Sequence, residues 1–178
     1  MKNLLIAGYS AFDLGIFKND DPKLQVIQEA IRNRLENYRD NGVEWLIFGG
    51  NLGFEYWTFM LAGKEFPELL RAVIFPFETT GQNWNEANQA KLGDFKQAEF
   101  VKYCFSDYEN PRQFRTYDEF LIENSDGALV LYDEERESEA ETPNKLHFRM
   151  DQLKAQADYP VDFISFEELQ ETAENLAE

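Results

Sequence analysis

The chain has 178 residues, the length of one domain, and 43% of them are hydrophobic, so it can bury a core without disulfides or metals. It carries 17 Lys and Arg against 34 Asp and Glu, a formal net charge of -17. This charge repels phosphate backbones and anionic lipids, which argues against nucleic-acid and membrane-surface binding.

The single cysteine, Cys104, excludes an intrachain disulfide and fits a reducing compartment. The apolar run after Met1 is too short for a signal peptide, and no apolar stretch approaches the roughly 20 residues that span a bilayer. We therefore expect a cytoplasmic protein without membrane insertion. The oligomeric state stays open, with a homo-oligomer among the alternatives.

Short apolar segments rich in β-forming residues alternate with helical segments along the chain. We expect strands at Leu4–Ala7, Glu44–Phe48, Arg71–Phe75, Phe100–Phe105, Gly127–Tyr132 and Val161–Ile164. The continuous apolarity of Ala128–Leu131 is typical of a strand that is covered on both faces. The alternation predicts one α/β domain over residues 1–178, with a doubly wound, mainly parallel sheet in a Rossmann-like three-layer sandwich.

Capping residues, first-turn prolines and apolar stripes predict the helices between these strands. They should run from Asp21 to Asn41, from just after Gly53 to about Phe66, from about Asn85 to Ala98, from Asn110 to near Asn124, and over Asn144–Ala157 and Phe166–Leu176. Two segments are expected to be loops. Ala11–Asp20 is long enough for a binding loop, and the acidic stretch Asp133–Pro143 should be a mobile, solvated connection.

The strongest candidate site is a glycine-rich turn that contains Gly49, Gly50, Asn51 and Gly53. It follows a predicted strand and opens a predicted helix, so the backbone can approach a ligand closely and free N–H groups can bind an anion. A tight turn with close helix packing would also account for these glycines. Glu55, in the first helical turn, either only complements the helix dipole or accepts hydrogen bonds from a ligand.

Further candidate contacts follow the ends of the other strands, because ligands of parallel sheets bind outside the carboxyl ends, at the topological switch point. These candidates are Gly8, Tyr9, Ser10 and Phe12 after the first strand, Asn83 and Trp84 after the third, and Tyr132 and Asp133 after the fifth. Ser10 could donate to a phosphate, and Tyr9 or Phe12 could stack on a base. Turn formation and packing are the alternative for each.

Complete catalytic sets are missing from the sequence. His147 is the only histidine, no Cys/His cluster has metal-ligand spacing, and there is no G-x-S-x-G nucleophile motif. Cys104 lies in a predicted strand, where a buried, inert thiol is expected. Asp126 precedes a strand and is expected to serve a turn at the amino edge of the sheet. No catalytic residue and no cofactor is identified.

Several motifs occur together along nearly the whole chain. They are Gly8-Tyr9 with Phe12, Leu14–Phe17, Gly50-x-Leu52-Gly53-x-Glu55-x-Trp57, Pro76-Phe77, Asn83-Trp84-x-Glu86-x-Asn88, Ser125–Gly127, Leu131–Asp133 and Tyr159-Pro160. With these motifs the chain resembles the YpsA-like family, a bacterial group within the SLOG superfamily of Rossmann-like domains. The resemblance implies a nucleotide-like ligand that is either sensed or processed. The proline-glycine-glycine motif of the superfamily's phosphoribohydrolases is not reproduced.

Three functions therefore compete. The leading hypothesis is a regulatory protein that binds a nucleotide or ribose-phosphate-like ligand: Gly8–Ser10 and Gly50–Gly53 would cradle the phosphate, and Phe12 and Trp84 would cover the base. The second is a hydrolase that cleaves an N-glycosidic or phosphate-ester bond, with Glu55 or Asp133 as acid–base carboxylate. The third is a partner-binding scaffold in cell-division or envelope control.

Overall fold

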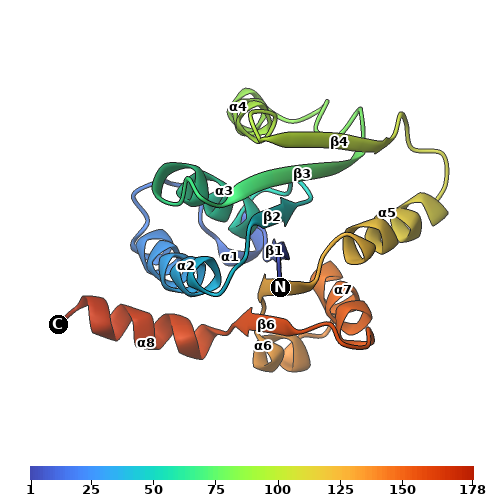
Figure 1. Ribbon diagram of the computed structural model, residues 1–178. Coiled ribbons are helices and arrows are strands. Elements are labelled where there is room, and N and C mark those ends of the chain that lie inside the picture. The colour runs from blue at the N-terminus through green and yellow to red at the C-terminus, as the bar shows by residue number, and fades with distance from the viewer.

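Six parallel strands form the centre of the computed structural model, which describes residues 1–178 (Figure 1). They are β1 (Asn3–Gly8), β2 (Trp45–Phe48), β3 (Leu70–Phe77), β4 (Phe100–Phe105), β5 (Gly127–Leu131) and β6 (Val161–Ile164), in the spatial order β4-β3-β2-β1-β5-β6. Every neighbouring pair is parallel. The predicted mainly parallel α/β sheet is confirmed.

Helices cover both faces of this sheet. They are α1 (Ala11–Leu14), α2 (Pro22–Asp40), α3 (Phe54–Glu65), α4 (Glu86–Phe95), α5 (Arg112–Glu123), α6 (Glu134–Glu139), α7 (Lys145–Lys154) and α8 (Phe166–Leu176). In Figure 1, α2, α3 and α8 lie to the left of the sheet, α4 lies at the top beside β4, and α5 and α7 lie to the right. This three-layer arrangement is the Rossmann-type fold that the sequence predicts.

The position of a strand in the sheet explains its sequence. Central β5 is buried at every residue, whereas edge strand β4 keeps Phe100 and Lys102 exposed. The chain adds β2, β3 and β4 on one side of β1 and then crosses to add β5 and β6 on the other side. The topological switch point therefore lies between β1 and β5, where a ligand crevice is expected at the carboxyl edge.

Two segments that we expected to be loops contain helices, so both predictions were wrong. In the first, Ser10 and Asp13 form a reciprocal capping box that starts α1, and Gly15 ends it with a left-handed φ of 66°. In the second, the Asp133 carboxylate accepts a hydrogen bond from the Arg136 N–H and caps α6. Capping satisfies N–H groups that a loop leaves free, and the Arg136 guanidinium joins the two segments by donating to the Asp13 carbonyl at 3.1 Å.

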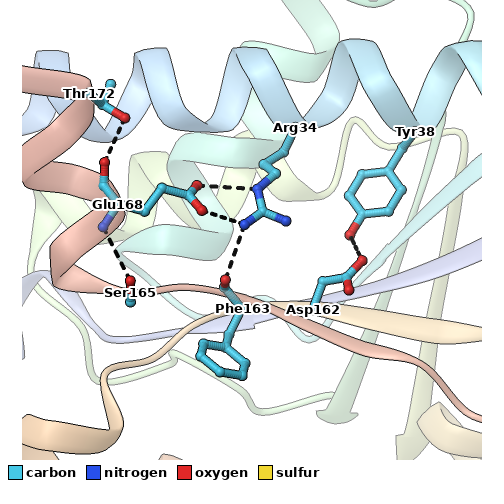
Figure 2. A network of polar contacts seen from close by, with 7 residues as sticks. All are labelled: Arg34, Tyr38, Asp162, Phe163, Ser165, Glu168 and Thr172. Atoms are coloured by element: carbon cyan, nitrogen blue, oxygen red, sulfur yellow. Dashed lines mark hydrogen bonds and ion pairs between the residues drawn. The ribbon is translucent and has the colours of Figure 1, made fainter. Parts of the chain in front are cut away.

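A network of polar contacts ties the C-terminal part of the chain to α2 (Figure 2). The Arg34 guanidinium donates to the Glu168 carboxylate of α8 and, at 3.2 Å, to the Phe163 carbonyl of β6. The Tyr38 hydroxyl donates to Asp162 at 2.5 Å. These contacts fix β6 and α8 against the long helix α2.

Measured against the length and apolarity that a bilayer requires, none of the helices could serve as a membrane span.

Candidate functional site

A cleft of about 660 Å³ opens at the carboxyl ends of β1, β2 and β3, beneath α5 and α7. The turn after β1 contributes Gly8, Ser10 and Asp13, and the turn after β2 contributes Gly49, Asn51, Leu52 and Glu55. Pro76 comes from β3, and Phe114, Tyr117 and Asp118 from α5. The start of α7 adds Asn144, Lys145, Leu146, Phe148, Arg149 and Gln152. This volume suits a ligand of nucleotide size.

The two predicted glycine turns lie against each other at the base of this cleft. Gly53 has a φ of 101°, and a Cβ there would stand 2.5 Å from the Ala11 nitrogen. The Phe54 N–H donates to the Tyr9 carbonyl at 3.1 Å. The turn after β2 can approach the turn after β1 this closely only because position 53 lacks a side chain.

Glu55 is 2% exposed, and the turn after β2 binds its carboxylate. The Gly49 N–H donates to Oε1 at 2.6 Å, and the Asn51 side-chain amide donates to Oε2 at 2.5 Å. Burial nevertheless raises the pKa of Glu55, against the opposing effects of Asn51, Arg149 and Gly49. A buried carboxyl with a raised pKa in a cleft is a frequent property of functional sites.

Tyr117 of α5 holds the same turn from the opposite side. Its buried hydroxyl donates to the Ile74 carbonyl of β3 at 2.6 Å and lies 3.4 Å from the Gly49 carbonyl. A Cβ on Gly49 would stand 2.6 Å from this hydroxyl. Burial raises the pKa of Tyr117, so the phenol stays protonated and acts as a donor. The backbone at position 49 is thus fixed by two helices, α3 and α5.

Arg149 brings positive charge to the cleft from α7. Its Nη2 donates to the Asp118 carboxylate of α5 at 2.8 Å, with 22% of the Arg149 side chain exposed. Lys145 lies one turn earlier, in the first turn of the same helix, which Asn144 caps by accepting from the Leu146 N–H. The two cations and the helix start attract an anion, whereas the acidic residues Asp13, Glu55 and Asp118, which line the same cleft, oppose it.

Five of the predicted site residues line this cleft: Gly8, Ser10, Gly49, Asn51 and Glu55. Two more predicted glycines shape it from behind, because Gly53 packs on the Ser10 backbone and Gly50 packs on the Phe75 ring.

The remaining predicted residues lie outside the lining. Tyr9 is buried and stacks on Tyr132 with 6.1 Å between ring centroids, and its hydroxyl accepts from the Asp133 N–H. Phe12 is 81% exposed. Asn83 is exposed, and the Trp84 ring packs over Gly81.

Sequence reasoning missed the contribution of α5 and α7. Tyr117, Asp118, Lys145 and Arg149 carry no motif that marks them as a site. A general rule could have found them, since a helix that follows a parallel strand begins at the carboxyl edge of the sheet. The first turns of α5 and α7 must therefore face the same edge as the glycine turns.

Asp126, His147 and Cys104 lie outside the cleft lining and have structural contacts. Asp126 accepts hydrogen bonds from the N–H groups of Lys2 and Asn3, which lowers its pKa, as expected of turn chemistry at the amino edge. His147 pairs through Nδ1 with the Tyr132 hydroxyl at 2.9 Å. Cys104 is partly buried in β4, and burial raises the pKa of its thiol. No group of three or more His, Cys, Asp or Glu side chains is arranged to hold a metal ion.

The sequence is similar to those of several bacterial proteins. A sequence model of the YpsA family, described as the YspA SLOG family, matches residues 4–169. A UPF0398 protein of Lactococcus lactis subsp. cremoris is 50% identical over 179 aligned positions, which cover 99% of each chain. A UPF0398 protein of Streptococcus thermophilus is 48% identical and covers 96% of this chain and 98% of its own length.

The fold is similar to that of DNA processing protein A from Streptococcus pneumoniae, as seen in its X-ray structure. The TM-score is 0.50 with 12% sequence identity, and the match covers 98% of this chain but 56% of that one. At this identity the likeness concerns the fold alone.

Proposed function

Since the chain belongs to the YpsA family of SLOG proteins, we propose that its cleft binds a nucleotide or ribose-phosphate-like ligand, in a regulatory role in the cytoplasm. The observation that carries this proposal is the convergence of the glycine turn after β2, the start of α7 and Arg149 on one cleft. A helix N-terminus and a guanidinium are usual partners of a phosphate.

The charge of the whole chain makes this local arrangement informative. With a net charge of -17, an anion is repelled by most of the surface, so its binding depends on the cations of the cleft. The one hydrogen bond of the Arg149 guanidinium is to Asp118, and a guanidinium has five N–H donors. The remaining donors can serve a phosphate. The Glu55 carboxylate would then orient a ligand hydroxyl.

Thermal unfolding in the presence of single nucleotides and ribose 5-phosphate tests this function. A bound ligand at about 100 times its Kd should raise the free energy of unfolding by about 2.7 kcal/mol. Arg149→Gln should weaken binding by roughly tenfold or more, equal to about 1.4 kcal/mol, because it removes the charged contact. The control is Arg115→Gln, since Arg115 is exposed and pairs only with Glu119 on α5. Unaltered affinity in Arg149→Gln would contradict the proposed site.

The raised pKa of Glu55 favours one alternative, a hydrolase that acts on the same ligand. A carboxyl whose pKa is raised by burial keeps its proton to a higher pH than an ordinary glutamate, which suits general acid catalysis. Asp133, the other carboxylate considered, lies outside the cleft, where it caps α6 and accepts from the Phe166 N–H. If this alternative holds, purified protein turns over a nucleotide, and Glu55→Gln abolishes turnover while binding persists. Binding without turnover in the wild type leaves the regulatory function as the better account.

A further inference from the structure

The cleft has two unlike ends. One end is polar and contains the buried residues Gly49 and Glu55, whereas the outer part carries the exposed rings of Phe114 and Phe148. Phe114 is 48% exposed and Phe148 is 64% exposed. What distinguishes these two from the other exposed phenylalanines is their place: each stands on one of the two helices above the cleft and lines it.

Each ring is held by neighbouring aromatic side chains. Phe114 meets Phe77 edge to face, with 5.5 Å between centroids and an interplanar angle of 90°, and Tyr108 lies 5.8 Å away. Phe148 meets His147 at 5.8 Å and 74°, and His147 is in turn bonded to Tyr132. Edge contacts of this kind leave a ring face free for stacking.

We propose that Phe114 and Phe148 stack on the base of the ligand, so that the cleft selects a nucleotide over a sugar phosphate. This inference rests on the proposed function, and it replaces the pair Phe12 and Trp84, which lie outside the cleft lining. Stacking on a neutral base does not depend on charge, which suits a chain with twice as many acidic as basic residues. Aromatic side chains can stack in this way on any of the bases, because every base has a π-face.

Calorimetric titration can separate the base from the sugar phosphate. The probes are AMP, GMP, CMP, UMP and ribose 5-phosphate, titrated into the full chain and into Phe114→Ala and Phe148→Ala. We expect at least one nucleotide to bind roughly tenfold more tightly than ribose 5-phosphate. Each variant should lose about tenfold in affinity for that nucleotide and keep its affinity for ribose 5-phosphate.

Phe100→Ala is the matched control. Phe100 is 49% exposed, close to the value for Phe114, but it lies in a different groove beside Trp45 and Phe120. This variant should bind all probes as the wild type does. Because all three phenylalanines are exposed, the variants should fold, which circular dichroism can verify.

The outcomes distinguish this inference from the function on which it rests. If nucleotides and ribose 5-phosphate bind equally well, or if both variants keep wild-type nucleotide affinity, the stacking role is wrong while ligand binding in the cleft stands. If none of the probes binds to the folded wild type, the proposed function fails and the stacking role fails with it. Loss of nucleotide binding in Phe100→Ala as well would also overturn the assignment of Phe114 and Phe148.

Discussion

Glu55 makes the stability of this protein depend on pH in a direction that can be predicted. Burial raises its pKa in the folded state, whereas an unfolded chain titrates a glutamate at about 4.3. Between these two values the folded protein binds more protons than the unfolded chain, so this group's contribution to stability falls as the pH rises. Glu55→Gln lacks this proton uptake and should therefore gain stability relative to the wild type across the window.

Urea unfolding of both proteins over a series of pH values measures this effect. Glu65→Gln provides a control of opposite sign, because hydrogen bonding to Arg32 lowers the pKa of Glu65. The stabilisation from that ion pair is present above the unfolded pKa and is lost as the pH falls, so Glu65→Gln should lose stability relative to the wild type as the pH rises. A pH-independent difference between Glu55→Gln and the wild type would contradict the raised pKa.

Gly53→Ala should destabilise the protein by roughly 2 to 4 kcal/mol, since it adds backbone strain to a steric clash. The residue has a φ of 101°, and its Cβ would meet backbone atoms of Ser10 and Ala11 at 2.5 to 2.7 Å. Gly93→Ala is the control: Gly93 lies inside α4, and a Cβ there would have no neighbouring atom within 4 Å, so alanine should add about 0.5 to 1 kcal/mol. Urea unfolding measures both variants. If Gly53→Ala were as stable as the wild type, the turns after β1 and β2 would be able to move apart at little cost.

At the scale of elements, Arg34 determines how firmly α8 is attached. Arg34→Ala removes the contacts to Glu168 and to the Phe163 carbonyl, which should cost roughly 1 kcal/mol because the pair is partly solvated. The loss should concentrate at the C-terminus, so the amides of α8 should exchange hydrogen faster while those of α5 keep their rates.

Arg115→Ala is the matched control, since its pair with Glu119 is also an arginine–glutamate contact but leaves 83% of the arginine side chain exposed. It should change stability by about 0.3 to 0.5 kcal/mol and leave exchange in α8 unaltered. Faster exchange throughout the chain in Arg34→Ala would indicate that α8 unfolds only together with the core.

The elements were predictable where local chemistry and burial agree. Helix α8 was predicted at its observed bounds, Phe166–Leu176, because Ser165 caps it and an apolar stripe follows. The two helices that were missed, α1 and α6, have four and six residues, too few for a periodic pattern to show. The spacing Ser10-x-x-Asp13 is a capping-box pattern that could have marked the start of α1 from the sequence.

At the scale of the molecule, half of the site followed from the sequence. Gly8, Ser10, Gly49, Asn51 and Glu55 were identified because consecutive strands of a parallel sheet bring their ends to one edge. The other half comes from α5 and α7, whose contacts with those turns join residues far apart in the chain, as Tyr117 joins Gly49 and Ile74. Such pairings depend on how the layers pack, and no local pattern reports them.

The net charge predicts that this protein does not bind DNA. A protein that binds DNA without sequence preference reaches a Kd of about 10⁻⁴ to 10⁻⁶ M at physiological salt through lysine and arginine contacts to phosphates. This chain carries 34 acidic against 17 basic residues, and six of its eight arginines pair with carboxylates.

A single-stranded oligothymidine should therefore show no binding by fluorescence anisotropy at protein concentrations up to about 10⁻⁴ M. Binding that weakens steeply as salt is added would contradict this, because such a slope counts phosphates neutralised by basic side chains. A single nucleotide meets the same repulsion, and its binding depends on Lys145 and Arg149, which lie in a cleft that Asp13, Glu55 and Asp118 also line.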